Sequence, residues 1–470
     1  MEEFLTQLEA FLTQIVNAVN DVLWNKQLLL LFLLLGTGIY FTIRTNFVQV
    51  RKFGEGFRRL FGNINLHGDK AGKEGMSSFQ ALTTAIAAQV GTGNITGCAT
   101  ALCAGGPGAI FWMWISAFFG MATIYGEAVL AQVSRTKDKS GHVTGGPIYY
   151  IRAAFKGRLG KFLAGFFSIA IILALGLMGN MVQANSIGVA FENAFHIPKL
   201  ITGVLVAAVA AFIFLGGVKR IASFTEKLVP IMACFYIFGC VVLLILNLPM
   251  LPAAIRSIFV CAFQPQAVLG GAVGLGVKEA MRYGVARGLF SNEAGMGSTP
   301  HAHALAKVEK PQDQGVIAMM GVFIDTFVVL TLTALVILTS GLCQPGMEGA
   351  LDGTALAQAA FCQTFGHLGN IFLAICMLFF AFSTIIGWYF FGETNVKALF
   401  HDSKIAHRIY AVLVVACIVL GSVQKVSLVW NASDMFNGLM VIPNLLAVLF
   451  LGRVVFKAAR GESVSVKDLE

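Results

Sequence analysis

The sequence "QVGTGN", Gln89 to Asn94, interrupts a stretch of chain that otherwise has the composition of a membrane-spanning helix. A helix in lipid satisfies its backbone N–H and C=O groups internally, so two glycines around a threonine indicate a break. A second stretch of the same kind, "LFSNEAGMGS", runs from Leu289 to Ser298. The purpose of these two breaks decides what fold and what function the sequence predicts.

The 470 residues are 57% hydrophobic and only 12% charged, whereas soluble domains carry about 25% charged residues. The apolar runs, such as Leu28 to Phe41, are continuous and long, which predicts an all-α integral membrane protein and not a β-barrel. The predicted eleven spans are residues 27–43, 77–104, 108–133, 160–190, 200–217, 226–248, 269–305, 314–341, 368–391, 408–424 and 435–453.

The net charge of +9 reflects membrane topology, because most basic residues lie in connections on one face of the predicted spans. The largest groups are Arg44 to Lys73, Arg135 to Lys161 and Lys397 to Arg408. The positive-inside rule therefore places the N-terminus outside and the C-terminus in the cytoplasm of a plasma membrane, as in a bacterial inner membrane. No nucleic-acid partner is indicated. The nine cysteines contain no C-x-x-C pair, which favours buried thiols over a metal site or a disulfide framework.

The two breaks fall at matching places in two groups of five spans, residues 77–248 and 269–453, with 27–43 as an accessory helix. An odd number of spans per group gives the two groups opposite orientations in the membrane. Matching glycine-interrupted helices are typical of inverted-repeat transporters with a site at the bilayer midplane. The approach to the second break carries charges, Lys278 to Arg287, which either line a water-filled vestibule or place the span elsewhere within 263–305. We favour the vestibule.

The first break offers groups for an amino acid and for a cation. We expect positive φ at Gly91 and Gly93, and free amides at Thr92 and Gly93 that can bind a carboxylate. The side-chain oxygen of Asn94 could ligate Na⁺ without adding charge. The alternative is a packing notch of small residues for a neighbouring helix.

The second break repeats these parts, with oxygen donors at Ser291 and Asn292 followed by Glu293. Phe290 could form a wall of a small pocket. Glu127, an acid inside the third span, either braces this break or is a structural hydrogen-bonded group.

Further candidate groups lie in the later spans. Ser383 and Thr384 present adjacent hydroxyls, which bind a cation or back-bond to their own helix. Trp388 follows one turn later as pocket wall or core residue. Asp325, in the cytoplasmic half of the eighth span, could neutralise a cation or pair with an arginine. The H-x-H of His301 and His303 does not predict a zinc site, because residues two apart on a helix do not face each other.

Three stretches resemble the sodium:alanine (alanine or glycine:cation) symporter family: "GGPGAIFWMWISAFFG" (Gly105–Gly120), "RYGVARGLFSNEAGMGS" and "QVGTGNI". The resemblance extends from about residue 25 to 455. It implies the leucine-transporter fold, with five-plus-five inverted repeats and an extra N-terminal helix.

The resemblance also implies roles for individual residues. The amides of Thr92 and Gly93 would hold the substrate carboxylate, and carbonyls near Phe290 its ammonium group. One Na⁺ site would contain Val90, Ser383 and Thr384, and a second, if present, Asn94 and Ser291. The full substrate set is Gln89, Gly91, Thr92, Gly93, Phe290, Asn292, Thr384 and Trp388.

The sequence therefore predicts Na⁺-coupled symport of alanine or glycine into the cytoplasm by alternating access. No enzyme activity, organic cofactor or obligate protein partner is indicated. H⁺ coupling remains an alternative, in which Glu127, Glu293 or Asp325 would titrate. An ion channel is less favoured, because paired broken helices form one enclosed site and not a continuous pore.

Overall fold

The computed structural model describes residues 2–61, 76–137, 141–264, 276–345, 350–424 and 426–469. Most of these residues are helical. Two strands of two residues each, β1 (Thr136–Lys137) and β2 (Val143–Thr144), pair in an antiparallel hairpin. Eight helices are long and apolar enough to cross a membrane: Phe11–Arg44, Gly108–Ser134, Gly157–Phe195, Gly217–Leu246, Pro311–Ser340, His367–Leu399, Lys404–Val423 and Val429–Phe450. The all-helical membrane class is confirmed, and the count of eleven spans stays a prediction.

The first half of the chain contains the following helices, in order. They are α1 (Glu2–Asn20), η1 (Asp21–Asn25), α2 (Leu29–Arg44), α3 (Val48–Arg51), α4 (Phe53–Phe61), α5 (Ser78–Gln89), η2 (Gly93–Gly97), α6 (Cys98–Gly105), α7 (Gly108–Ser134), α8 (Pro147–Ala154), α9 (Gly157–Ile171), η3 (Ile172–Gly179), α10 (Asn180–Phe195), α11 (Lys199–Phe214), α12 (Gly217–Leu246), η4 (Leu248–Met250) and α13 (Leu251–Phe263).

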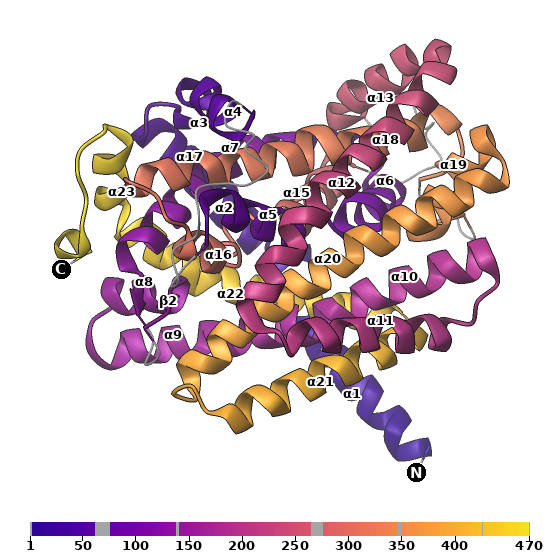
Figure 1. The fold of residues 1–470 in the computed structure, drawn as a ribbon. Helices are drawn as coiled ribbons and strands as arrows, with labels where there is room; N and C mark the ends of the chain where they lie inside the picture. The colour runs from indigo at the N-terminus through magenta and orange to yellow at the C-terminus, as the bar shows by residue number, and fades with distance from the viewer. Residues whose placement is uncertain are drawn as a thin grey trace.

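The second half continues with α15 (Val277–Asn292), α16 (Pro300–Leu305), α17 (Pro311–Val322), η5 (Phe323–Leu330), α18 (Thr331–Ser340), α19 (Gly353–Phe365), α20 (His367–Leu399), α21 (Lys404–Val423), α22 (Val426–Phe450), α23 (Gly452–Ala459) and η6 (Val466–Leu469). In Figure 1 the long helices lie roughly side by side, and the short α5, α6, α15 and α16 lie among them.

Both predicted breaks are present. The helix α5 ends at Gln89, Val90 is extended, and the chain turns helical again with the wide π-helical turn η2 at Gly93. The second break separates α15 from α16, and its backbone has positive φ at Glu293 (57°), Gly295 (90°) and Gly297 (79°).

The prediction of positive φ at Gly91 and Gly93 is wrong, because neither is among the described residues with positive φ. These glycines are instead required by close packing. An added Cβ on Gly91 would overlap the hydroxyl oxygen of Thr384, and one on Gly93 would lie 3.0 Å from the Cα of Ser291. The conformational freedom of glycine is used at the second break and its small size at the first.

The sequence did not predict several of the helices, among them α13, which packs against α7, and α19, which packs against α20. Each of these two has 13 residues, which is too short to cross a bilayer and so gives no spanning signal. The predicted seventh span, 269–305, corresponds to α15, the break and α16. Residues 265–275 lie outside the described part of the chain.

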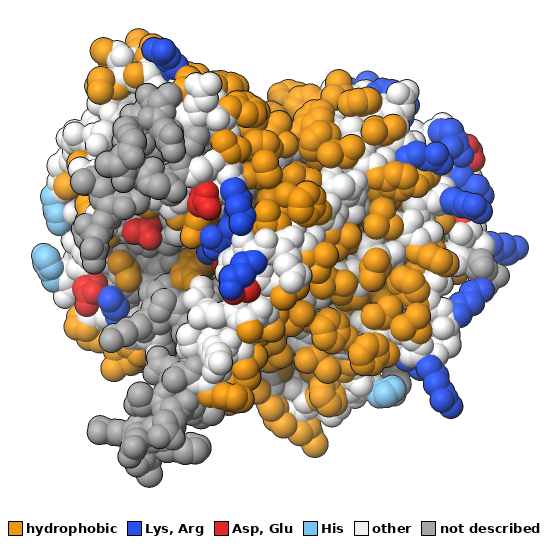
Figure 2. All heavy atoms as spheres, turned by 180° about the vertical axis from the view of Figure 1, so that it is seen from behind, with side chains coloured by type: hydrophobic (Ala, Val, Ile, Leu, Met, Phe, Trp, Pro, Cys, Tyr) orange, Lys and Arg blue, Asp and Glu red, His pale blue; other side chains and the backbone are white. Residues whose placement is uncertain are grey.

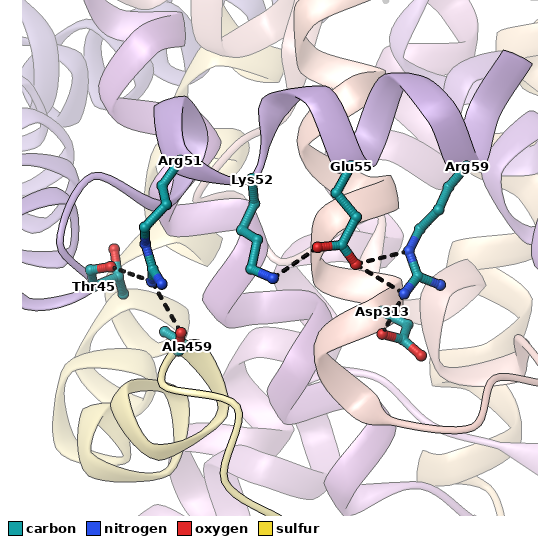
Figure 3. Close-up of polar contacts among 7 residues, drawn as sticks. All are labelled: Thr45, Arg51, Lys52, Glu55, Arg59, Asp313 and Ala459. Carbon is teal, nitrogen blue, oxygen red and sulfur yellow. Dashed lines mark hydrogen bonds and ion pairs between the residues drawn. The ribbon is translucent and has the colours of Figure 1, made fainter. Parts of the chain in front are cut away.

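A group of charged residues ties the segment after α2 to the rest of the molecule (Figure 3). Glu55 on α4 accepts hydrogen bonds from Lys52 (2.7 Å) and Arg59 (2.8 Å), and Arg59 also pairs with Asp313 on α17 at 2.9 Å. Arg51 donates to the carbonyl oxygen of Ala459 at the end of α23. These contacts hold α3 and α4 against α17 and α23.

Candidate functional site

The two breaks meet directly in the interior of the helix bundle. Gln89, the last residue of α5, donates from Nε2 to the carbonyl oxygen of Asn292, the last residue of α15, at 2.7 Å. Gly93 approaches the backbone of Ser291 closely enough that a side chain there would crowd it. All four residues are buried. The structure therefore brings the free helix ends of both halves of the chain to one point.

The prediction that the Thr92 amide is a free donor is wrong, because it donates to Gln183 Oε1 on α10 at 3.1 Å. Around this contact three buried polar atoms have no partner among the described residues: Gln89 Oε1, Thr92 Oγ1 and Gln183 Nε2. Buried polar groups are rarely left without a hydrogen bond. One acceptor and two potential donors at the first break can therefore serve a buried polar ligand.

Oxygen atoms of α5 and α20 cluster beside the first break. Thr384 Oγ1 lies 2.9 Å from the carbonyl oxygen of Ala87, 3.4 Å from that of Val90 and 3.1 Å from that of Phe380. Ser383 Oγ lies 3.3 Å from the Ala87 oxygen and 2.8 Å from the Phe380 oxygen. The hydroxyls thus back-bond to their own helix and also face α5. Five neutral oxygens converge, which is the donor chemistry that hard cations prefer.

A second polar cluster surrounds Asp325, in the wide π-helical turn η5 at the middle of the Pro311–Ser340 helix. Its carboxylate accepts hydrogen bonds from Asn94 (2.6 Å), Ser291 (2.9 Å) and Thr326 (2.8 Å). Of the two roles considered for Asp325, pairing with an arginine is not what the structure shows, since the recorded partners of this carboxylate are neutral. The Oδ1 of Asn94 accepts from the amide of Gly91 at 2.9 Å, so it stabilises the break itself. The cluster joins both breaks to the eighth predicted span.

The side chain of Asn292 is also used within the protein. Its Nδ2 donates to Thr326 Oγ1 at 3.2 Å, and its Oδ1 accepts from the amide of Ala294 at 3.0 Å. A direct side-chain contact of Asn292 with substrate would have to replace one of these bonds. Its carbonyl oxygen, which Gln89 reaches, is the group that the geometry favours for the site.

Aromatic rings border the meeting point of the breaks. Phe290 packs edge to face against Trp388 with ring centroids 5.6 Å apart, and against Trp430 on α22 at 5.0 Å. The indole Nε1 of Trp388 donates to Glu293, which also accepts from Ser298. Phe290 and Trp388 are thus fixed relative to each other, as a wall that limits the size of a bound side chain requires.

Glu127 on α7 contacts the second break. Its carboxylate accepts from the amides of Gly295 and Gly297, each at 3.0 Å, and from Asn444 Nδ2 on α22. Asn444 also donates to the Gly295 carbonyl and accepts from the hydroxyl of Tyr150 on α8. This arrangement satisfies the amide groups that the interrupted helix leaves without backbone partners.

The charged approach to the second break is partly neutralised. Arg287 makes two hydrogen bonds of 2.9 Å to the carboxylate of Asp434, and its guanidinium lies 4.8 Å from the ring centroid of Trp430. Lys278 is exposed, and Glu279 and Arg282 are partly exposed. One charge of this segment is thus buried and paired, and the other three reach the surface of the structure.

The two histidines after the second break are structural. His301 hydrogen-bonds to the carbonyl oxygen of Ser298 and to Asn395, and His303 to Gln314. Within the described residues there is no group of three or more His, Cys, Asp or Glu side chains that could hold a metal ion.

Sequence reasoning missed Gln183, Asn444 and the carbonyl groups of Ala87 and Phe380. No local motif marks Gln183 or Asn444, which lie on helices far from both breaks in sequence. The two carbonyl groups could have been predicted, since Ala87 lies three residues before Val90, and Phe380 lies four residues before Thr384. Those spacings place successive carbonyls on one helix face.

The sequence comparisons identify the same family of transporters over nearly the whole chain. The sodium:alanine symporter family matches residues 9–464. The chain is 42% identical to the sodium/alanine symporter AgcS of Methanococcus maripaludis, over 94% of this chain and 95% of that protein. It is 43% identical to the probable sodium/glutamine symporter GlnT of Bacillus subtilis, over 96% of this chain and 91% of that protein.

The fold is similar to that of solved transporter structures. The transporter MhsT in complex with L-phenylalanine superposes with a TM-score of 0.59 at 16% identity, over 84% of this chain and 95% of MhsT. A manganese transporter of Eremococcus coleocola superposes with a TM-score of 0.51 at 15% identity, over 87% of this chain and 82% of that transporter. These similarities show the leucine-transporter fold that both neighbours share.

Proposed function

The chain belongs to the sodium:alanine symporter family and is a sodium-coupled amino acid symporter, and we propose that it carries alanine or glycine into the cytoplasm. Transport proceeds by alternating access around the meeting point of the two breaks. The N-terminus lies outside, and residues 77–248 and 269–453 form the two inverted repeats.

The observation that carries the proposal is the oxygen cluster between α5 and α20. The carbonyls of Ala87, Val90 and Phe380 and the hydroxyls of Ser383 and Thr384 would hold Na⁺. All five are neutral, so the bound ion would carry its charge into the membrane without a resident carboxylate. Because the last turn of α5 also borders the break, an ion here would stabilise the same backbone that receives the amino acid.

The substrate would be held by the unpartnered polar atoms at the first break. Gln183 Nε2 and Thr92 Oγ1 can donate to a carboxylate, and Gln89 Oε1 can accept from an ammonium group. The carbonyl of Asn292, which now accepts from Gln89, lies beside them. The rings of Phe290 and Trp388 border this point and would restrict the side chain of a bound amino acid, which favours alanine or glycine over larger amino acids.

A second cation position is supported by the Asp325 cluster. Asn94 and Ser291 would contribute to it, and the carboxylate could alternatively bind a proton. This is the observation that favours H⁺ coupling as the second candidate. The two candidates differ in whether a Na⁺ gradient or a pH gradient drives uptake.

The deciding experiment is uptake of radiolabelled alanine into proteoliposomes under an inward Na⁺ gradient, an inward H⁺ gradient, both or neither. Uptake above equilibrium with Na⁺ alone is the expected result. Accumulation that needs only the H⁺ gradient would support proton coupling. Accumulation of glutamine in place of alanine or glycine would contradict the proposed substrate.

A further inference from the structure

A cavity of about 310 Å³ lies outside the transport site, where the end of α7, α8 and the C-terminal segment η6 meet. Its lining combines the hydroxyl-bearing residues Ser134 and Tyr149, the cationic Arg152 and Lys156, and the apolar Val466 and Leu469. Cations, hydroxyls and an apolar wall in one cavity suit a ligand with an anionic head and an apolar body.

The surroundings of the cavity have the character of a membrane interface. On α9, which follows directly, Arg158 and Lys161 are exposed beside Leu159 (56% exposed) and Phe162 (67% exposed). Basic residues alternating with exposed apolar ones are typical of a helix end at the level of lipid headgroups.

Basic side chains are frequent along the edge of the molecule at this position. Figure 2 shows a broad hydrophobic surface with Lys and Arg side chains gathered along one edge, the side on which α8, α9 and α23 lie in Figure 1. By the positive-inside rule this edge faces the cytoplasm, where the membrane leaflet is rich in anionic lipids.

We propose that this cavity binds the phosphate group of an anionic phospholipid, with the acyl chains lying along the exposed apolar residues of α9. Arg152 and Lys156 would contact the phosphate, and the hydroxyl group of Tyr149 would donate to its oxygens. A lipid is favoured over a soluble anion because the exposed apolar residues Leu159 and Phe162 follow Lys156 closely in the chain, at the start of α9.

The bound lipid would influence transport through α8. Tyr150, adjacent to the cavity residue Tyr149, donates its hydroxyl hydrogen bond to Asn444, and Asn444 contacts both Glu127 and the Gly295 carbonyl at the second break. A headgroup that fixes α8 would therefore fix the second break as well. The inference rests on this chain of contacts and not on the identity of the transported amino acid.

Binding is tested first, without substrate. Thermal unfolding of the full chain is measured in nanodiscs of phosphatidylcholine alone and of phosphatidylcholine with one-fifth phosphatidylglycerol. The wild type should melt several degrees higher with phosphatidylglycerol. The double variant Arg152→Gln, Lys156→Gln should lose the shift, since each basic residue near the surface contributes a factor of about five in affinity for anionic lipid. The matched control is Lys404→Gln, Arg408→Gln, on another segment predicted for the same face.

Transport is then measured in proteoliposomes of the same two lipid compositions. The expected result is a several-fold faster uptake with phosphatidylglycerol for the wild type and the control, and no lipid dependence for the cavity variant. Tyr150→Phe should keep the thermal shift but lose the rate increase. Equal lipid dependence of wild type and cavity variant would overturn the proposal. So would a full effect of inorganic phosphate in phosphatidylcholine, which would identify a soluble anion as the ligand.

Discussion

The hydroxyl oxygen of Thr384 on α20 lies 2.9 Å from the carbonyl oxygen of Ala87 on α5. A side-chain hydroxyl that bonds to its own helix has no need to face another helix, yet this one does both. The contact joins the first broken helix to a long unbroken one. In the proposed Na⁺ site, the ion would replace the internal hydrogen bond between the Thr384 hydroxyl and the Ala87 carbonyl.

Thr384→Val should therefore raise the Na⁺ concentration for half-maximal uptake while the protein folds normally. Losing one polar ligand costs about 1–3 kcal/mol, equivalent to a shift of about 5- to 150-fold. Thr394→Val is the control, because Thr394 lies on the same helix and its hydroxyl donates to the carbonyl of Phe390 in that helix. Unchanged Na⁺ dependence in Thr384→Val would exclude this hydroxyl from the ion site.

Phe290→Ala should admit valine and leucine as substrates, with weaker uptake of alanine. The ring of Phe290 packs against Trp388 and closes the region where a substrate side chain would lie. Pocket shape discriminates by about 1–3 kcal/mol per methylene, so the change in competition profile should be partial. Phe361→Ala, which removes a buried ring between α19 and α20, should leave the profile unchanged.

The breaks were predictable from the sequence because glycines in an apolar run leave a local mark. Among the partners of the breaks, Glu127 and Asp325 were named as candidate residues, but Gln183 and Asn444, which reach the breaks from helices distant in the chain, were not. The same limit explains the wrong expectation of a free amide at Thr92. Sequence shows that a backbone amide is released from a helix, but not which distant side chain then accepts its hydrogen bond.

Glu127→Gln should destabilise the protein and slow transport. The carboxylate accepts from three N–H donors, of Gly295, Gly297 and Asn444. A glutamine amide would turn an NH₂ group toward one of these donors. The buried donor would then lack an acceptor, which costs about 1–3 kcal/mol of folding free energy. Thermal unfolding in detergent measures this. Glu279→Gln, at the partly exposed start of α15, serves as control and should retain nearly wild-type stability.

The stability of the α4 contacts should depend on acid pH. Hydrogen bonding from Lys52, followed by that from Arg59, holds the pKa of Glu55 below its ordinary value (Figure 3). Because the folded-state pKa is the lower one, the stabilisation is fully present above the unfolded-state pKa of about 4.3 and is lost as pH falls through the folded value. Melting temperatures across this range should fall more steeply for the wild type than for Glu55→Gln. Parallel curves for the two proteins would contradict this expectation.

Gly93→Ala tests whether the first break exists to bring the two halves of the site together. The backbone at Gly93 does not have positive φ, so alanine causes no conformational strain there, and helix propensity would favour it by about 1 kcal/mol. The cost comes from contact. The new Cβ would lie 3.0 Å from the Cα and 3.1 Å from the Cβ of Ser291, and 3.3 Å from Cδ1 of Phe290.

Relieving these contacts requires α15 to move away from the first break, which would weaken the bond from Gln89 to Asn292 and the cluster around Asp325. Overpacking of this kind costs about 1–3 kcal/mol, so we expect a moderate fall in melting temperature together with loss of Na⁺-driven uptake. Gly97→Ala is the matched control, since its Cβ would meet only the Thr92 carbonyl oxygen at 3.8 Å. That variant should fold and transport normally. Normal transport by Gly93→Ala would show that the close approach of the two breaks is not needed for the site, and the proposed substrate position would then be wrong.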